Sequence, residues 1–135
     1  MNRIASAIVV PTGPNYTQRI ATGGFELSAD EPVSAGGRNM GPGPYNLLLA
    51  SLGACTSITL KMYADRKGWN IGTLRVTLTL SKDTEGHTFI DRTLDSDVKL
   101  DGEQWLKLID IASKTPVTKT LLAGARVTTR RAKET

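Results

Sequence analysis

The stretch between Arg38 and Lys61 contains no charged residue, and this run constrains the fold more than any other part of the sequence. Proline is favoured in the first turn of a helix and glycine just beyond the last, so Pro44 and Gly68 predict a helix over residues 44–67. The first half of this helix is apolar on all sides, which is typical of a helix buried on several faces. A single domain of 135 residues offers limited material for such burial, so we expect a second subunit to cover part of it.

The same uncharged stretch is broken up by prolines, glycines and hydroxyl residues, and it falls short of the ~20 strongly apolar residues that a membrane span needs. Residues 1–10 contain too short an apolar run for a signal peptide. Charged residues make up 22% of the chain and hydrophobic residues 39%, as in an ordinary soluble globular protein. We therefore expect a cytoplasmic protein that has no membrane partner.

Strand patterns flank the long helix on both sides. β-branched residues and alternation indicate extended segments, and Gly23–Gly24 suits a tight turn between two of them because glycine accepts positive φ. Asp101 can cap a helix that starts directly after it, and Pro116 starts a shorter helix that Gly124 ends. Strands and helices in separate runs predict an α+β fold, in one domain over residues 1–135. The predicted strands are residues 3–10, 16–22, 24–30, 73–83, 88–100 and 125–130.

Spacing of three and four residues predicts one buried stripe on each of the two longer helices. On the helix over residues 44–67, this stripe includes the only cysteine of the chain. The members of the first stripe are Leu48, Ser51, Leu52, Cys55, Ile58, Thr59 and Met62. The members of the second stripe are Trp105, Leu108, Ile109 and Ala112.

The lone cysteine, Cys55, rules out an internal disulfide and a cysteine-based zinc cluster. The single His87 cannot complete a histidine site either, so no metal or cofactor is expected. A free cysteine is most often a small buried hydrophobe. The alternative is a nucleophile, which must be a thiolate, and because burial disfavours the charged form a nearby cation has to compensate. Arg19 and Arg38 are the candidate cations, and each requires the chain to fold back on the helix.

The C-terminal residues 126–135 are predicted to form a basic strand and tail. Lysine and arginine bind phosphates, but no aromatic residue for stacking on bases lies among these cations. We interpret the segment as a solvated terminus, and nucleic acid is not expected as a partner. The cations of this segment are Arg126, Arg130, Arg131 and Lys133.

The block ADEPVSAGGRNMGPGPYNLLLASLGACTSITLKMYADRKGW, residues 29–69, resembles the OsmC/Ohr family of osmotically inducible and organic-hydroperoxide-resistance proteins. It is most similar to the branch with a GPxPYxLLLAxLGACT pattern. The resemblance implies an OsmC-like fold, in which antiparallel sheets wrap around long central helices of an intertwined homodimer with two interfacial active sites. It also implies that a cysteine at the position of Cys55 attacks a hydroperoxide, and that a second cysteine resolves the resulting sulfenic acid.

Two positions depart from the pattern that the resemblance implies. Thr115, in TPVTKTL, stands where the resolving cysteine is expected, and Tyr45 stands where the peroxidase branch carries a glutamate. Threonine forms no disulfide, so an external thiol has to reduce the sulfenic acid. By position, Arg19 is the nearest analogue of the arginine that this branch uses. The predicted catalytic residues are Cys55, Arg19 and Arg38, and the predicted substrate pocket is Tyr45, Leu48 and Leu52.

Two functions follow from these residues, and the sequence leaves both open. The first is a thiol-dependent peroxidase-like protein that reduces organic hydroperoxides through Cys55, as a one-cysteine variant in oxidative-stress defence. Apolar walls around the thiol favour organic peroxides over hydrogen peroxide. The second is a catalytically degenerate homodimer that binds a small apolar ligand in the interfacial cleft, which Thr115 and Tyr45 favour.

Overall fold

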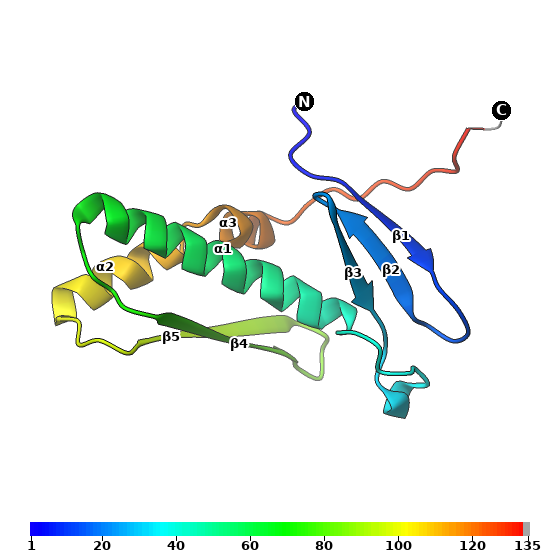
Figure 1. Cartoon of the computed structure of the whole chain (residues 1–135), viewed down its shortest axis with the longest axis horizontal. Helices are drawn as coiled ribbons and strands as arrows, with labels where there is room; N and C mark the ends of the chain where they lie inside the picture. The colour runs from blue at the N-terminus through cyan, green and yellow to red at the C-terminus, as the bar shows by residue number, and fades with distance from the viewer. Residues whose placement is uncertain (134–135) are drawn as a thin grey trace. The chain divides into compact units, whose positions relative to one another are not determined.

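The computed structural model describes residues 1–133 and combines helices with antiparallel sheets (Figure 1). The chain divides into two compact units, Met1–Ala50 and Ser51–Thr135, and one long helix runs from the first into the second. The strands are β1 (Ala7–Pro11), β2 (Gln18–Thr22), β3 (Phe25–Ala29), β4 (Leu74–Lys82) and β5 (Thr88–Ser96). The helices are η1 (Val33–Ala35), α1 (Pro44–Lys67), α2 (Gly102–Ala112) and α3 (Pro116–Ala123). The predicted helix over residues 44–67 is confirmed.

The first unit holds a three-stranded antiparallel sheet in the order β1–β2–β3. Across these strands Val9 pairs with Ile20, and Ile20 pairs with Leu27. The predicted turn at Gly23–Gly24 is confirmed, with φ values of 59° and 82° that glycine adopts at little cost.

Asp30, at the end of β3, organises the loop that leads to α1. Its carboxylate accepts hydrogen bonds from Thr17 Oγ1 at 2.7 Å and from the backbone N–H groups of Glu31, Arg38 and Met40 at 2.7, 3.3 and 3.1 Å. Burial on its own raises the pKa of Asp30, but these hydrogen bonds outweigh burial and lower the pKa below its ordinary value. The ionised carboxylate therefore holds the loop together.

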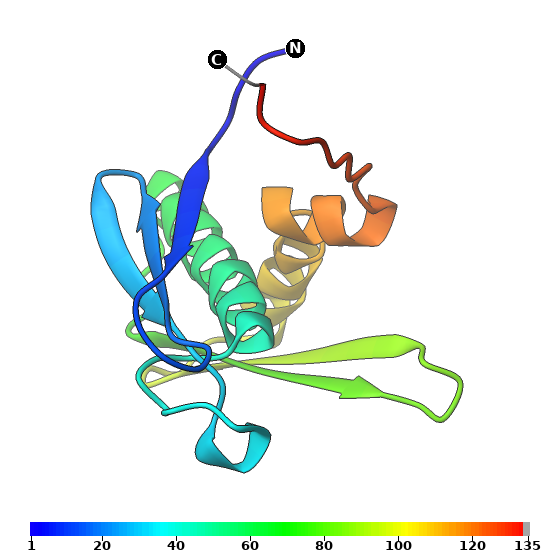
Figure 2. The same cartoon turned by 90° about the vertical axis from the view of Figure 1, so that its right-hand side faces the viewer.

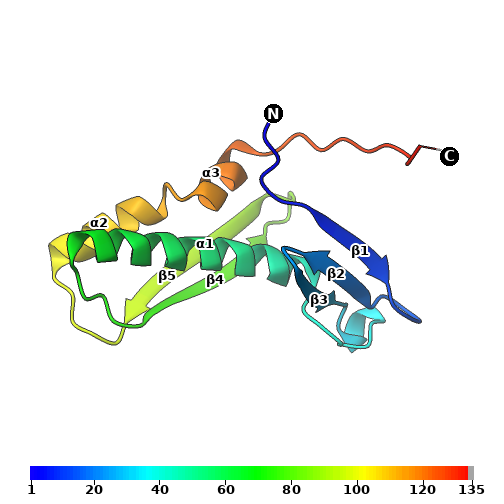
Figure 3. The same cartoon turned by 45° about the horizontal axis from the view of Figure 1, so that its top comes forward.

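The second unit is built on a long hairpin. β4 and β5 pair antiparallel, with Leu78 opposite Arg92, and Figures 2 and 3 show α1 and α2 over one face of this hairpin. Burial alternates along both strands, so every second residue faces the helices. On β5 the inward row is Ile90, Arg92, Leu94 and Ser96, and Arg92 is its charged member.

The hydrophobic core of the second unit lies where α1, α2 and the segments flanking the hairpin meet. Gly53 lets α1 approach β4 closely, because a Cβ at this position would lie 2.8 Å from Leu78 Cδ1. Asp101 caps α2 as predicted: its side chain accepts a hydrogen bond from the backbone N–H of Gln104, and the Gln104 side chain accepts one from the N–H of Asp101. The buried core residues are Leu60, Ala64, Ile71, Leu100, Leu108 and Ala112.

The buried stripe of α1 differs from the prediction. Ile58 and Met62 are exposed, and Cys55 is only half-buried. Because this helix is apolar on nearly all sides, its sequence does not determine which face is buried. The hairpin and α2 pack against a row of residues that are four positions apart. By length and composition alone α1 could also cross a membrane, a test that the core helix of a soluble protein passes as well. The buried residues of α1 are Leu52, Thr56, Leu60 and Ala64.

Two further predictions near the C-terminus were wrong. On α2, Leu108 and Ala112 are buried as expected, but Ile109 is exposed. Residues 125–130 form no strand, because no other strand within residues 1–133 pairs with them. The last two residues of the predicted basic tail, 134 and 135, lie outside the described part of the chain.

Candidate functional site

Cys55 lies on the part of α1 that belongs to the second unit, and its thiol is free. It is half-buried, next to Thr56, which is fully buried. Thr56 Oγ1 donates a hydrogen bond to the carbonyl of Leu52, one turn earlier, at 2.7 Å. This bond fixes the direction of the hydroxyl, so its lone pairs remain available to a donor from the hairpin.

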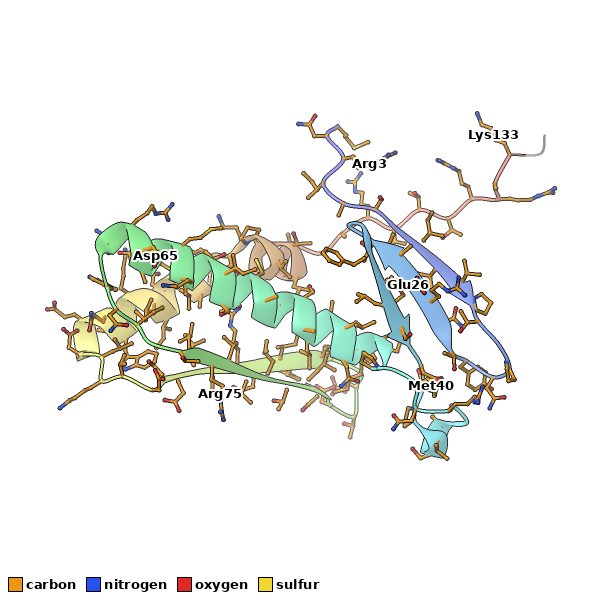
Figure 4. The ribbon with its side chains drawn as sticks, viewed as in Figure 1. Arg3, Glu26, Met40, Asp65, Arg75 and Lys133 are labelled. Carbon is orange, nitrogen blue, oxygen red and sulfur yellow. The ribbon has the colours of Figure 1, made fainter. Side chains whose placement is uncertain are left out.

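That donor is Arg92 of β5. Its Nη1 donates to Thr56 Oγ1 and to Thr118 Oγ1, each at 2.9 Å, and its Nη2 donates to the carbonyl of Ala112 at 2.8 Å. One guanidinium thus joins the hairpin to α1, α2 and α3. Arg75 of β4, in contrast, points away from the helices (Figure 4).

Arg92 and Cys55 interact electrostatically. Burial lowers the pKa of the Arg92 guanidinium from its ordinary value, and electrostatic attraction to Cys55 opposes that shift. Three N–H groups of the guanidinium donate hydrogen bonds to acceptors within residues 1–133. A guanidinium has five N–H groups, so two more can donate to other acceptors. The site therefore combines the thiol of Cys55 with a guanidinium that is fixed by hydrogen bonds.

Thr115 is 1% exposed and is joined to this arginine through Thr118. The two hydroxyl oxygens lie 2.6 Å apart, and Thr118 Oγ1 is also 3.2 Å from the carbonyl oxygen of Ala112. Thr115 stands at the N-cap of α3, yet its hydroxyl makes no capping bond to that helix. Thr115, for which the resemblance implies the place of a resolving cysteine, is thus a buried, hydrogen-bonded hydroxyl.

A cavity of about 470 Å³ lies beside the arginine, between β5 and α2. Polar and apolar groups contribute about equally to its wall, and Arg92 is the charged residue among those that line it. The lining residues are Arg92, Thr93, Leu94, Trp105, Ile109, Ala112 and Ser113. Among the described residues no group of histidine, cysteine, aspartate and glutamate side chains could hold a metal ion.

The two arginines named from the sequence lie in the first unit. Arg19, on β2, forms an exposed ion pair with Glu26 of β3, with 3.2 Å between Nε and Oε1. Arg38 is exposed in the loop around Asp30 and donates its backbone N–H to that carboxylate. The role of either arginine beside Cys55 stays a prediction.

The predicted pocket residues are divided between the units. Tyr45 and Leu48 lie in the first two turns of α1, and Tyr45 lines a separate cavity of about 300 Å³ within the first unit. Leu52 is buried one turn before Thr56. Sequence reasoning missed Arg92, although a signal was present: in TFIDRTLDS, alternation places Arg92 on the same face as Ile90 and Leu94.

Comparison with known proteins gives a consistent result. The family described as OsmC-like protein matches residues 36–130. A putative osmotic stress induced and detoxification response protein from Psychrobacter arcticus is similar in structure, with a TM-score of 0.76, 17% identity, and 89% of this chain and 90% of that chain covered. An OsmC-like protein from Mycoplasma pneumoniae has a TM-score of 0.71 and 23% identity, covering 90% and 89%.

The organic hydroperoxide resistance protein OhrB of Bacillus subtilis is also similar, with a TM-score of 0.59 and 24% identity over 87% of this chain and 90% of that chain. At these identities the likeness establishes the fold. A comparison with curated proteins gave no significant match.

Proposed function

We propose that this chain, which belongs to the family of OsmC-like proteins, is a one-cysteine peroxidase that reduces organic hydroperoxides through Cys55 in the defence against oxidative stress. The observation that carries the proposal is the Arg92 guanidinium, which is held by three hydrogen bonds, one of them to Thr56, the residue next to Cys55 in the chain. A neighbouring cation favours the thiolate over the thiol, and the thiolate is the nucleophile. The structure of an organic hydroperoxide resistance protein among its neighbours supports the same chemistry.

The reaction requires Cys55, the hydroperoxide and an external thiol reductant. The Cys55 thiolate attacks the terminal oxygen of the hydroperoxide, so an S–O bond forms, the O–O bond breaks, and the alkoxide leaves and takes a proton from solvent. Cys55 is then a sulfenic acid. A thiol condenses with it to a mixed disulfide and releases water, and a second thiol displaces Cys55 from that disulfide. Because Thr115 supplies no second sulfur, both thiols come from outside the chain.

A second copy of the chain is the partner that we propose for the exposed apolar surfaces. On α1, Ile58 and Met62 are exposed. The resemblance to intertwined homodimers makes residues of the first unit candidates for a shared site, with Arg19 and Arg38 as cations and Tyr45 in the pocket. We also propose a cytoplasmic location. The exposed apolar residues of the first sheet are Ile8, Val9, Val10, Phe25 and Leu27.

Consumption of cumene hydroperoxide with dithiothreitol as reductant tests the proposal. We expect the wild-type protein to consume the peroxide and Cys55→Ser to be inactive, because only the sulfur can be oxidised and reduced. Arg75→Met is the matched control, since it removes an outward-facing arginine from the neighbouring strand. Equal rates for wild type and Cys55→Ser would remove the enzymatic function.

The alternative is a catalytically degenerate homodimer that binds a small apolar ligand. Thr115 and the cavity beside Trp105, with Leu94 and Ile109 in its wall, favour this second function. Titration with fatty acyl and aromatic ligands tests it by intrinsic tryptophan fluorescence. Saturable binding together with an inactive wild-type protein would favour the alternative, and absent binding would count against it.

A further inference from the structure

The three buried threonines around Arg92 form a closed set of hydrogen bonds. A threonine hydroxyl has one proton to donate and two lone pairs that accept. Thr56 donates its proton to the Leu52 carbonyl and accepts from Arg92. Thr118 accepts from Arg92, and its own proton is satisfied by the carbonyl of Ala112 at 3.2 Å. The hydroxyl oxygens of Thr115 and Thr118 lie 2.6 Å apart and share a hydrogen bond in which either hydroxyl can be the donor.

The hydroxyl of Thr118 therefore has three hydrogen-bond partners, Arg92, Thr115 and the Ala112 carbonyl. It cannot rotate away from the guanidinium without losing its bond to the Ala112 carbonyl, and Thr115 holds it from the other side. Thr56, Thr115 and Thr118 are 0%, 1% and 8% exposed, so bulk water does not take over a lost bond.

We infer that Thr118, backed by Thr115, is a positioning residue that holds the Arg92 guanidinium beside Cys55. The inference deepens the proposed function and rests on it for its biological meaning. Position 115, which supplies no disulfide partner in this chain, contributes a hydroxyl to the support of the cation instead. A thiol at this position would be a weaker hydrogen-bond donor than the hydroxyl.

Two alkylating agents test the inference on the full chain. Iodoacetamide is neutral and iodoacetate is an anion of similar size, so the ratio of their rates reports positive charge near the sulfur as well as its reactivity. Cys55 is the only cysteine, and every thiol adduct therefore reports on this site. We expect Thr118→Val, which keeps the shape and loses the hydroxyl, to alkylate at least about threefold more slowly at neutral pH and to lower the iodoacetate-to-iodoacetamide ratio.

Thr118→Ser is the rescue variant, and it should keep both the rate and the ratio of the wild type. Circular dichroism of each variant establishes that it is folded at the assay temperature. If Thr118→Val is not folded, Thr115→Val and Thr115→Ser are read in the same way, with a smaller decrease expected because the direct contact to Arg92 remains.

A folded valine variant with wild-type rate and ratio would overturn the inference, and so would a serine variant that falls as far as the valine variant. These results are separable from a failure of the proposed function. A wild-type protein that shows the expected alkylation pattern but reduces no hydroperoxide would refute the peroxidase and leave the role of Thr118 standing.

Discussion

Replacing Arg92 with methionine separates the two interpretations of Cys55, a reactive thiolate or a packing residue. Methionine keeps most of the length and apolar bulk of the side chain. It removes the charge and the three hydrogen bonds at 2.9, 2.9 and 2.8 Å. A nearby cation favours the charged form of a neighbouring acid, so we expect Cys55 in the variant to alkylate more slowly at neutral pH, by roughly tenfold.

The same substitution also lowers stability. Hydrogen bonds from a charged group contribute about 1.5–3 kcal/mol each. Removing a half-buried guanidinium from its apolar surroundings also relieves a desolvation cost of several kcal/mol. The two effects oppose each other, and we expect a net loss of about 1–4 kcal/mol in the free energy of unfolding.

The assay is pseudo-first-order alkylation by iodoacetamide, followed by intact-mass spectrometry, with the unfolding free energy taken from urea titration. Arg75→Met should match the wild type in both measurements, because this arginine is exposed on the outer face of β4. A folded Arg92→Met variant that alkylates as fast as the wild type would refute the argument and leave Cys55 as a packing residue.

Three further predictions concern the fold. Leu108→Ala should lower the unfolding free energy by about 2–5 kcal/mol in urea titration, because Leu108 is fully buried in the core; a loss below ~1 kcal/mol would contradict that packing. Gly53→Leu should be more destabilising than Gly53→Ala by thermal melting, because a Cβ there already meets Leu78 at 2.8 Å; equal melting temperatures would argue against the close approach. The pKa of Asp30 is depressed in the folded state, so its stabilisation is present above its unfolded value of 3.8 and is lost as the pH falls through the folded value. The stability gap between wild type and Asp30→Asn should therefore narrow below about pH 4, and a gap that is constant with pH would refute this linkage.

Local signals in the sequence predicted most of the elements. Pro44 and Gly68 bracket α1 because their backbone preferences act within one turn, and the Gly23–Gly24 turn follows from positive φ in the same way. The cap at Asp101 is equally local. None of these depends on what the element packs against, and that is why they hold.

The errors arose where contacts with other elements determine which residues are buried or which segments pair as strands. α1 is apolar on nearly every side, so the buried row through Thr56 is selected by the hairpin and α2 rather than by the pattern. Ile109 sits on a periodic position of α2, but no residue within the described range 1–133 covers it. Residues 125–130 have strand-forming side chains and no strand within residues 1–133 to pair with.

The cation at Cys55 was missed for a related reason. Arg19 and Arg38 precede the helix, whereas Arg92 follows Cys55 by 37 positions and is placed on the inward row by the register of β5. An arginine on the inward row of an alternating strand is itself a signal, because an unpaired charge at a buried position needs acceptors. The acceptors come from Thr56, Thr118 and the carbonyl of Ala112.

A single guanidinium that ties three helices to a hairpin makes reactivity and folding inseparable at one position. A substitution of Arg92 that changes the reactivity of Cys55 also weakens the contact between these elements. Variants at this position that react faster or slower will therefore differ in melting temperature as well. Thr115→Val and Thr118→Val keep the charge of Arg92 and remove one supporting hydroxyl each, so they offer a smaller adjustment of the reactivity of Cys55.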